Sequence, residues 1–409
     1  MQQITPNNPV IRTMGRIDID VPDRPVWVFP YTQATFRCTG TSVGVRLINR
    51  HNYGDSTLGA VIDGVPYRAR ITENDAETTV MLAEHLPDIE HEVVVYKRQD
   101  GEHYLEITGF LIDDQARVLP PATPAPIRRI EVYGDSVSCG ERNEAALYTG
   151  KADPDTDLSP YSNSWYSYAA ITARNLGASV NIVAQGGASL LDGIGWFCGP
   201  DYVGMESIWD RIEYNPFLGG TKPWDFSRYT PQVVVVALGQ NDAHPVDFMA
   251  ADYQGEQSVQ WRARYVDFLR TLRGKYLQAT IICATTCCLN RRPQQRHRPG
   301  PEGAPLPVFA QRFSHARSPA HRRTSGDGGR AHRLHRIPRP CDLGLTTVGN
   351  PSGPAAYHQE RNSHERITTD GHRPGTRRQR QRRGRKRSRS RTEQANRHRR
   401  VSAFRHLLP

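Results

Sequence analysis

Three short polar segments near the middle of the chain carry residue types that could hydrolyse an ester. They are Gly134-Asp135-Ser136, Gly186-Gly187-Ala188-Ser189 and Gly239-Gln240-Asn241-Asp242. Ester hydrolysis needs a nucleophile, together with hydrogen-bond donors aimed at the oxyanion of the tetrahedral intermediate. A serine on a tight turn exposes its hydroxyl, a glycine lets a backbone N–H approach a substrate closely, and an Asn side chain supplies a further N–H. Together the segments contain what acyl transfer requires.

Each segment directly follows an apolar stretch with the length and composition of a buried strand. These stretches are 130–133, 180–184 and 233–238, and the last of them is continuously apolar, as is typical of a parallel strand covered on both faces. Any one motif alone is weak, because Gly-Asp-Ser tripeptides are common and Gly-x-Asn-Asp after a strand is more often a turn. Active sites of doubly wound sheets lie just past the carboxyl ends of the strands. Three motifs in this order therefore predict a single site.

The remaining pattern of this region alternates between strands and helices. A helix is expected from Ser164 to Leu176, with Gly177 as its C-cap, and an amphipathic helix from Gln260 to Tyr276. A further buried strand is expected at 279–284. This alternation predicts an α/β domain of flavodoxin-like type over residues 127–288, with a parallel sheet and helices on both faces.

The first part of the chain has a different pattern. Short stretches rich in β-branched and aromatic residues are separated by turn signals such as Asp63-Gly64 and Asp100-Gly101. Many short strands at this spacing predict an antiparallel β-sandwich of jelly-roll type over residues 10–118. A Pro-rich stretch at 119–126 reads as a linker to the α/β domain, which makes the chain multi-domain. The expected strands lie at 26–29, 34–38, 43–47, 60–63, 78–82, 92–96 and 104–107.

Charge divides the chain at about residue 289. Residues 1–288 contain 24 Lys and Arg and 35 Asp and Glu. Residues 289–409 contain 29 Lys and Arg and 7 Asp and Glu. The overall charge of +11 is therefore the sum of an acidic N-terminal part and a basic C-terminal part. Arg, His, Pro and Gly dominate after Asn290, and no apolar period of 2 or 3.6 continues. We therefore predict that residues 289–409 are disordered, because they cannot bury enough apolar surface to offset the loss of chain entropy.

The order and residues of the three segments resemble the SGNH (GDSL-type) hydrolase superfamily, and more closely carbohydrate esterase family 2, the acetyl-xylan-esterase-like group. The second resemblance covers roughly residues 10–286 and includes the sandwich, the 130–140 segment, 166–174 and 224–231. It implies that Ser136 is the nucleophile and that Gly187 and Asn241 complete the oxyanion hole. Gly187 is preferred over Gly186, although a shift by one residue stays open. It also implies removal of acetyl groups from sugars without metal or organic cofactor, and exposed tryptophans such as Trp196, Trp209 or Trp224 stacking on sugar rings.

The resemblance also implies a fourth segment, carrying a His as general base, which this sequence lacks. Asp370-Gly371-His372 is the nearest look-alike but has the wrong spacing and no apolar flank, and His244 is read as a loop residue. The pattern changes abruptly near 286–290, and GC-rich coding sequence read out of frame yields Arg, Pro, Gly, Ala and His. We therefore hypothesise a reading-frame slip at this point, which would leave an esterase that is inactive for want of its base.

Other readings stay open. The basic end, with its Arg-rich run at 377–387, would bind nucleic acid only non-specifically through phosphates, because aromatic residues for base stacking are scarce. A lipase or acyl-esterase of the same superfamily, or a non-catalytic carbohydrate-binding protein, are the alternatives. Seven cysteines form no zinc or disulfide pattern, so free thiols are expected. The polar N-terminus shows no secretory signal, and no apolar run would span a membrane, which favours the cytoplasm.

Overall fold

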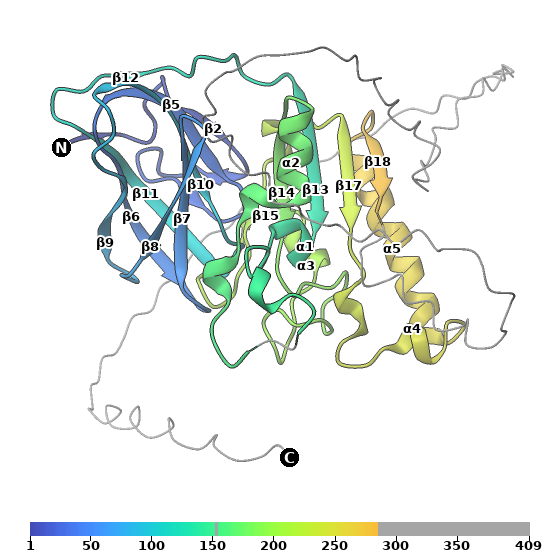
Figure 1. The fold of residues 1–409 in the computed structure, drawn as a ribbon. Helices are drawn as coiled ribbons and strands as arrows, with labels where there is room; N and C mark the ends of the chain where they lie inside the picture. Colours follow the sequence, from blue (N-terminus) through green and yellow to red (C-terminus); the bar gives the residue numbers. More distant parts are fainter. Residues whose placement is uncertain (152–153, 285–409) are drawn as a thin grey trace, which may run out of the picture. The chain divides into compact units, whose positions relative to one another are not determined.

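The computed structural model describes residues 1–151 and 154–284. Its first part consists of two antiparallel sheets, in the strand orders β3-β4-β11-β6-β9 and β12-β5-β10-β7-β8 (Figure 1). β1 adds to β11 in the first sheet, and β2 adds to β5 in the second. The strands are β1 (Gln2–Ile4), β2 (Arg12–Met14), β3 (Ile17–Asp18), β4 (Val26–Trp27), β5 (Gln33–Gly40), β6 (Val43–His51), β7 (Ser56–Ile62), β8 (Val65–Ile71), β9 (Glu77–Ala83), β10 (Ile89–Lys97), β11 (His103–Ile112) and β12 (Val118–Leu119).

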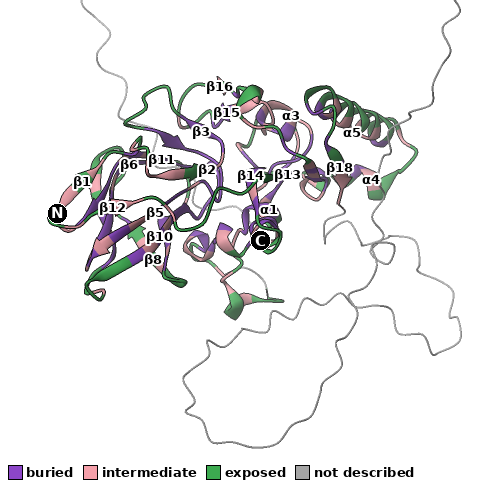
Figure 2. Cartoon of the chain, turned by 90° about the horizontal axis from the view of Figure 1, so that it is seen from above, coloured by how far each residue is buried: buried purple, intermediate pink, exposed green. Residues whose placement is uncertain are grey.

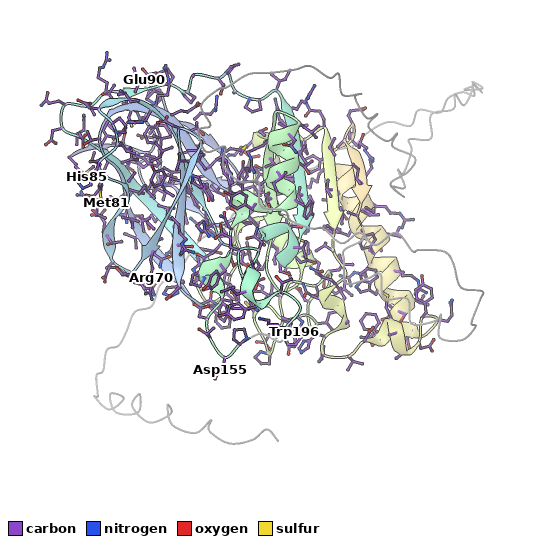
Figure 3. The ribbon with its side chains drawn as sticks, in the orientation of Figure 1. Arg70, Met81, His85, Glu90, Asp155 and Trp196 are labelled. Carbon is purple, nitrogen blue, oxygen red and sulfur yellow. The ribbon has the colours of Figure 1, made fainter. Side chains whose placement is uncertain are left out.

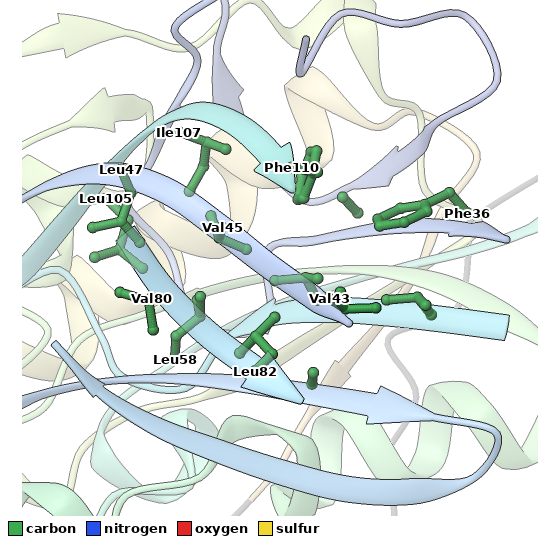
Figure 4. Packing of buried hydrophobic residues seen from close by; sticks show 14 of the residues in the cluster. Phe36, Val43, Val45, Leu47, Leu58, Val80, Leu82, Leu105, Ile107 and Phe110 are labelled. Carbon is green, nitrogen blue, oxygen red and sulfur yellow. The ribbon is translucent and has the colours of Figure 1, made fainter. Parts of the chain in front are cut away.

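Side chains that alternate along these strands form the core between the two sheets. Phe36 on β5, Val45 on β6 and Phe110 on β11 are fully buried, and the rings of Phe36 and Phe110 pack with their centroids 5.3 Å apart (Figure 4). Successive side chains of a strand point to opposite faces of the sheet, so every second residue enters the core. The predicted antiparallel sandwich is confirmed.

The second part is a parallel sheet in the order β14-β13-β17-β18, with helices on both of its faces. Alanines of α2 (Tyr168–Asn175) pack on Ile130 and Val132, whereas Phe268 and Leu272 of α5 (Glu256–Lys275) pack on the opposite face. β13 and β14 of this sheet are mostly buried (Figure 2). The sheet strands are β13 (Arg128–Gly134), β14 (Ala178–Ala184), β17 (Val233–Ala237) and β18 (Thr280–Cys283).

Short elements fill the connections of the α/β part. The remaining strands are β15 (Arg211–Glu213) and β16 (Lys222–Pro223), which pair with each other. The remaining helices are α1 (Ser136–Cys139), α3 (Met205–Ile208) and α4 (Phe248–Ala251), and the 3-10 helices are η1 (Ala146–Tyr148), η2 (Ser159–Tyr161), η3 (Ser164–Tyr166), η4 (Phe226–Arg228) and η5 (Asn241–Ala243).

The predicted α/β fold with a parallel sheet is confirmed, but three details of the expected elements are wrong. The helix expected over 164–176 is divided, because Ser167 adopts an extended conformation and its hydroxyl caps α2 by accepting from Ala170 N at 3.2 Å. The helix expected from Gln260 begins one turn earlier, at Glu256. β8 was not expected, because proline is disfavoured inside a strand and Pro66 is its second residue. Residues 289–409 and the proposed frame slip lie outside the described residues, and the domain limits at 118 and 126 stay predictions.

A buried ion pair joins the N-terminal segment to the central strand of the parallel sheet. Arg16, between β2 and β3, donates from Nη2 to Glu131 on β13 at 3.0 Å, and both side chains are inaccessible to solvent. Glu131 also accepts from the hydroxyls of Tyr133 at 2.8 Å and Tyr276 at 2.5 Å. A buried charge is tolerated only where it is paired and hydrogen-bonded. These bonds therefore hold the sandwich's first segment against β13.

No helix in the described part of the chain is long and apolar enough to cross a membrane.

We expect Arg16→Met to destabilise the protein by about 3–5 kcal/mol, because it leaves the Glu131 carboxylate buried without its partner. Adding Glu131→Gln should recover part of the loss, since the amide oxygen still accepts hydrogen bonds but carries no charge. Chemical denaturation measures both changes. As a control, Arg24→Met removes an ion pair to Glu106 whose Arg side chain is half exposed, and should cost less than about 1 kcal/mol. A double variant no more stable than Arg16→Met alone would contradict this account.

Candidate active site

The three polar segments meet at one edge of the parallel sheet. In the strand register Gly134 lies opposite Ala184 on one side and opposite Ala237 on the other, so β13, β14 and β17 end level with one another. Gln185 N donates to Gly134 O at 3.3 Å, and the Asn241 side-chain amide donates to Ala188 O at 2.9 Å. Neighbouring strands lie about 4.8 Å apart. The structure thus brings together the segments that carry Ser136, Gly187 and Asn241.

Ser136 is the first residue of α1, immediately after β13. Asp135 caps this short helix by accepting from Val137 N at 3.1 Å, and Gly140 ends it in the left-handed conformation at φ 75°. The Ser136 side chain is half-buried, whereas Ser138 is buried and bonds to the Tyr168 hydroxyl at 2.8 Å. The first N–H groups of a helix have no intrahelical acceptor. Ser136 therefore presents both a hydroxyl and a backbone N–H at the sheet edge.

The two adjacent glycines of the second segment differ in what their amides do. Gly186 N donates to Asp100 Oδ2 at 2.8 Å, whereas Gly187 N has no acceptor among residues 1–151 and 154–284. Gly187 has φ 77°, and its carbonyl accepts from Trp196 N at 2.9 Å. A Cβ there would lie 3.0 Å from Trp196 Cβ, so the position favours glycine. Of the two glycines, Gly187 is the one whose N–H is available to a ligand.

Asn241 begins η5 after β17, and its side chain is half-buried. Its amide donates to Ala188 O as described, and no acceptor for its second hydrogen occurs within the described ranges. The next residue, Asp242, ties this segment to the second one, because its Oδ1 accepts from Leu190 N at 2.9 Å and from Trp261 Nε1 at 2.5 Å. Asn241 therefore faces the Gly187 segment with an amide hydrogen to spare.

Two carboxyl groups beside these residues are poorly solvated. Burial raises the pKa of Asp135 to about 7, the charges of Asp242 and Glu141 add to the rise, and bonds from Val137 N and Gln240 oppose it. One carboxyl oxygen of Asp135 has no hydrogen-bond partner. Burial also raises the pKa of Asp242. Burial thus disfavours the ionised form of both carboxyl groups at the sheet edge.

No histidine in the described part of the chain bonds to Ser136. His244, which was read as a loop residue, follows η5, and its Nδ1 lies 2.5 Å from Gly195 O. His103 is buried in the sandwich against Ser56 Oγ at 2.6 Å. The segment 285–409, in which His372 was the nearest look-alike to a catalytic base, lies outside the described residues. Within residues 1–151 and 154–284, no histidine is bonded to the Ser136 hydroxyl as its general base would be.

An exposed aromatic surface lies beside the second segment. The ring of Trp196 is stacked on that of His244, with centroids 3.4 Å apart and an interplanar angle of 23°, and Trp196 is 62% exposed. Figure 3 places Trp196 among the loops at the end of the sheet toward which β13 and β17 run. Trp209 is half-buried and Trp224 is buried. Of the three tryptophans considered as sugar platforms, Trp196 alone is open to a ligand.

The part of the chain that the structure describes contains no group of three or more His, Cys, Asp or Glu side chains arranged to hold a metal ion. Its cysteines are free thiols, buried at Cys38 and Cys139 and half-buried at Cys198 and Cys283.

The fold and the three segments together define an SGNH-hydrolase fold placed behind an antiparallel sandwich. Residues 13–122 match the family model for the N-terminal domain of carbohydrate esterase 2. The chain is 33% identical to the cellulase/esterase CelE of Acetivibrio thermocellus over 285 residues, which are 68% of this chain but 31% of CelE. It is 28% identical to an acetylxylan esterase / glucomannan deacetylase of Cellvibrio japonicus, with 70% of this chain and 74% of the relative covered. The chain thus spans about a third of CelE.

Solved structures agree with these relatives. A family two carbohydrate esterase from Clostridium thermocellum, in complex with cellohexaose, matches with 29% identity and a TM-score of 0.55 over 68% of this chain and 77% of that one. An active-site mutant of a family two carbohydrate esterase from the same organism matches with 30% identity, the same TM-score and the same coverage. The chain belongs to carbohydrate esterase family 2.

We expect Asp135→Asn to stabilise the protein at pH 8 and to change little at pH 4. The carboxyl has a pKa near 3.8 when unfolded and about 7 when folded, so stability falls as the pH rises between these values. Asparagine has no carboxyl proton to lose, and one pKa unit corresponds to about 1.4 kcal/mol, so a rise of about three units should give a gain at pH 8 on the order of 4 kcal/mol. Denaturant unfolding at the two pH values measures the difference.

Asp113→Asn provides a control of opposite sign. Asp113 accepts from the backbone N and the hydroxyl of Thr41, and these bonds lower its pKa. Its contribution is present above the unfolded pKa, so this variant should lose stability at pH 8. Equal stability of wild type and Asp135→Asn at pH 8 would show that the Asp135 carboxylate is not disfavoured in the folded protein.

Proposed function

We propose that this chain is a serine esterase that removes acyl groups, principally acetyl, from carbohydrate hydroxyls. The observation that carries the proposal is that β13, β14 and β17 end level with one another, so the segments that carry Ser136, Gly187 and Asn241 lie at one sheet edge. The relative from Cellvibrio japonicus, described as an acetylxylan esterase and glucomannan deacetylase, supports the substrate class.

In the proposed reaction Ser136 Oγ forms a bond to the carbonyl carbon of the ester, and its proton passes to a general base. The carbonyl π electrons move onto oxygen, which gives a tetrahedral oxyanion. Collapse of this intermediate breaks the bond to the sugar oxygen, which leaves with a proton as the free hydroxyl. Water then attacks the acyl-serine in the same way, releasing the carboxylic acid and restoring Ser136.

The oxyanion would be held by three donors from three different strand ends. These are the backbone N–H groups of Ser136 and Gly187 and the second amide hydrogen of Asn241. None of them has to break an existing hydrogen bond before it donates to the substrate oxygen. Losing one such donor typically costs about 10²–10³ in kcat. Because the donors are fixed by the sheet register, little reorganisation would be needed when charge develops.

Among the described residues, no histidine is bonded to Ser136 to take its proton. A serine hydroxyl is a weak nucleophile unless a base takes its proton. We therefore expect a slow enzyme, in which a base added to the solution raises the rate, unless residues after Ala284 provide a histidine.

Trp196 is the residue proposed to bind the sugar. Trp196 is 62% exposed, and its indole ring is stacked on the ring of His244. The backbone N–H of Trp196 donates to the Gly187 carbonyl. A rigid aromatic face can cover the apolar face of a sugar ring at low entropic cost. A sugar on this face would lie next to the donors of the oxyanion.

We expect purified full-length protein to hydrolyse p-nitrophenyl acetate, Ser136→Ala to lose this activity, and imidazole to raise the wild-type rate above its effect on Ser136→Ala. Release of p-nitrophenol measures all of these, and the Ser136→Ala protein corrects for the reaction of imidazole with the ester. Ser138→Ala is the matched control, because Ser138 is buried and bonded to Tyr168. Equal rates for wild type and Ser136→Ala with imidazole present would reject Ser136 as the nucleophile.

Trp196→Ala should raise KM for an acetylated xylo-oligosaccharide by about tenfold, as expected from losing about 1.4 kcal/mol of binding. It should change KM for p-nitrophenyl acetate by less than about twofold, because this ester has no sugar. Tyr253→Ala, at another exposed aromatic residue that is 56% accessible, should alter neither value. An unchanged KM for the oligosaccharide would place the sugar elsewhere.

A further inference from the structure

The turn between β10 and β11 carries a sandwich carboxylate to the edge of the parallel sheet. Asp100 Oδ2 accepts from Gln185 Nε2 at 2.9 Å and from Gly186 N at 2.8 Å. Asp100 is 8% exposed and lies 86 residues before Gly186 in the sequence. A group from the sandwich is thus bonded directly to the segment that carries Gly187.

The Gln185 side chain connects Asp100 to the peptide bond between Gly186 and Gly187. Its Nε2 donates both to Asp100 and, at 3.0 Å, to the carbonyl of Gly186, while its Oε1 accepts from the Tyr214 hydroxyl at 2.7 Å. The Gly186 carbonyl and the Gly187 N–H belong to one planar trans peptide and point in opposite directions. Fixing the carbonyl therefore fixes the direction of the Gly187 N–H.

The fit around Gly186 leaves no room for a side chain. A Cβ on Gly186 would lie 2.7 Å from Asp100 Oδ2 and 2.5 Å from Glu141 Oε2. A Cβ on Gly101, next to Asp100, would lie 2.1 Å from the Tyr214 hydroxyl. All three distances are below those of real Cβ contacts, so the two glycines allow the turn and the segment to touch.

The turn that carries Asp100 is itself fixed from inside the sandwich. Lys97 is fully buried, and its ammonium donates to the carbonyls of Gln99, at 2.5 Å, and of Asp100. The Asn215 amide donates to the Gly101 carbonyl at 2.8 Å. Asp100 is therefore held rigidly from its own domain and can act as a fixed reference point for the second.

We propose that Asp100 is a positioning residue that aims the Gly187 N–H at the reacting oxygen. This inference rests on the proposed esterase function. The sandwich thus contributes to the site through Asp100 and Gln185 without touching the substrate. It also explains why Gly187, and not Gly186, is the proposed oxyanion donor. Asp100 accepts from the Gly186 N–H, so the Gly187 N–H is the one left for the substrate.

The test compares wild type, Asp100→Ala and Asp100→Asn in the full chain with p-nitrophenyl acetate. Misplacement of a reacting group by about 1 Å can cost about 10²-fold, so Asp100→Ala should lower kcat by this order and change KM by less than about twofold. Asp100→Asn keeps an acceptor oxygen and should recover part of the loss. Asp63→Ala is the control, because Asp63 bonds to His91 and to Glu92 N within the sandwich. A kcat for Asp100→Ala within twofold of wild type overturns the proposal.

Hydrogen exchange followed by mass spectrometry tests the same contact without relying on hydrolysis. A peptide containing residues 185–190 should exchange faster in Asp100→Ala than in wild type, and peptides from β6 and β11 should not. Unchanged exchange in 185–190 overturns the positioning role, whatever happens to kcat. If residues 185–190 exchange faster in Asp100→Ala but the wild-type protein hydrolyses no ester, the esterase proposal is rejected. The contact between Asp100 and this segment is then still supported. If Asp100→Ala does not fold, both readings are taken on Gln185→Leu, which removes the bonds to Asp100 and to the Gly186 carbonyl.

Discussion

The buried bond between Arg16 and Glu131 is the interaction on which the relation between the two parts of the fold depends. The guanidinium lies 5.1 Å from the centre of the Trp224 ring and 5.7 Å from that of Tyr133, and it also donates to the carbonyl of Trp209 at 2.7 Å. Glu131 stands on β13, five residues before Ser136. A buried ion pair adds little net stability by itself, but it specifies geometry, because any other placement leaves a charge without a partner. The strand that ends at Ser136 is therefore fixed relative to the sandwich.

This constraint explains why the sandwich can supply Asp100 to a segment of the α/β part. The N-terminal segment is anchored at Arg16, and the β10–β11 turn makes a second contact at Gln185 and Gly186. A third contact is made by Tyr104 of β11, whose hydroxyl accepts from the backbone N of Tyr214 at 2.8 Å. Three separated contacts therefore join the two parts. The direction of the Gly187 N–H can then be set from the sandwich.

Most of the fold followed from local pattern, because strands and helices have periods that can be read directly. The continuously apolar stretch around Val234 predicted a buried parallel strand, and β17 is one. β8 was missed because Pro66 lies inside it and proline is disfavoured within a strand, although its apolar residues alternate with Arg68 and Arg70 on the solvent side. The division of the helix at Ser167 depends on a single hydroxyl bond, which competes with the helical backbone and has no periodic signal.

Some residues of the candidate site could likewise be predicted from local sequence pattern, whereas others are revealed only by tertiary contacts. Ser136, Gly187 and Asn241 could be singled out because each follows a strand that reads as buried, and strand ends meet at one edge. Asp100 and Gln185 could not, because their role arises from a contact across 85 positions of sequence that no local pattern encodes. The exposure of Trp196 was equally hidden, since its difference from the buried Trp224 is a matter of tertiary packing.

The carboxyl groups around the sheet edge have a consequence for the chemistry. An oxyanion that forms near ionised carboxylates would be repelled, and the repulsion is strong where water is excluded. Burial raises the pKa of Asp135 to about 7 and that of Glu102, with added repulsion from Asp100 and Glu141, to about 9. Burial therefore disfavours the ionised forms of Asp135 and Glu102. Each carboxyl that stays neutral leaves one negative charge fewer near the N–H donors of Ser136 and Gly187.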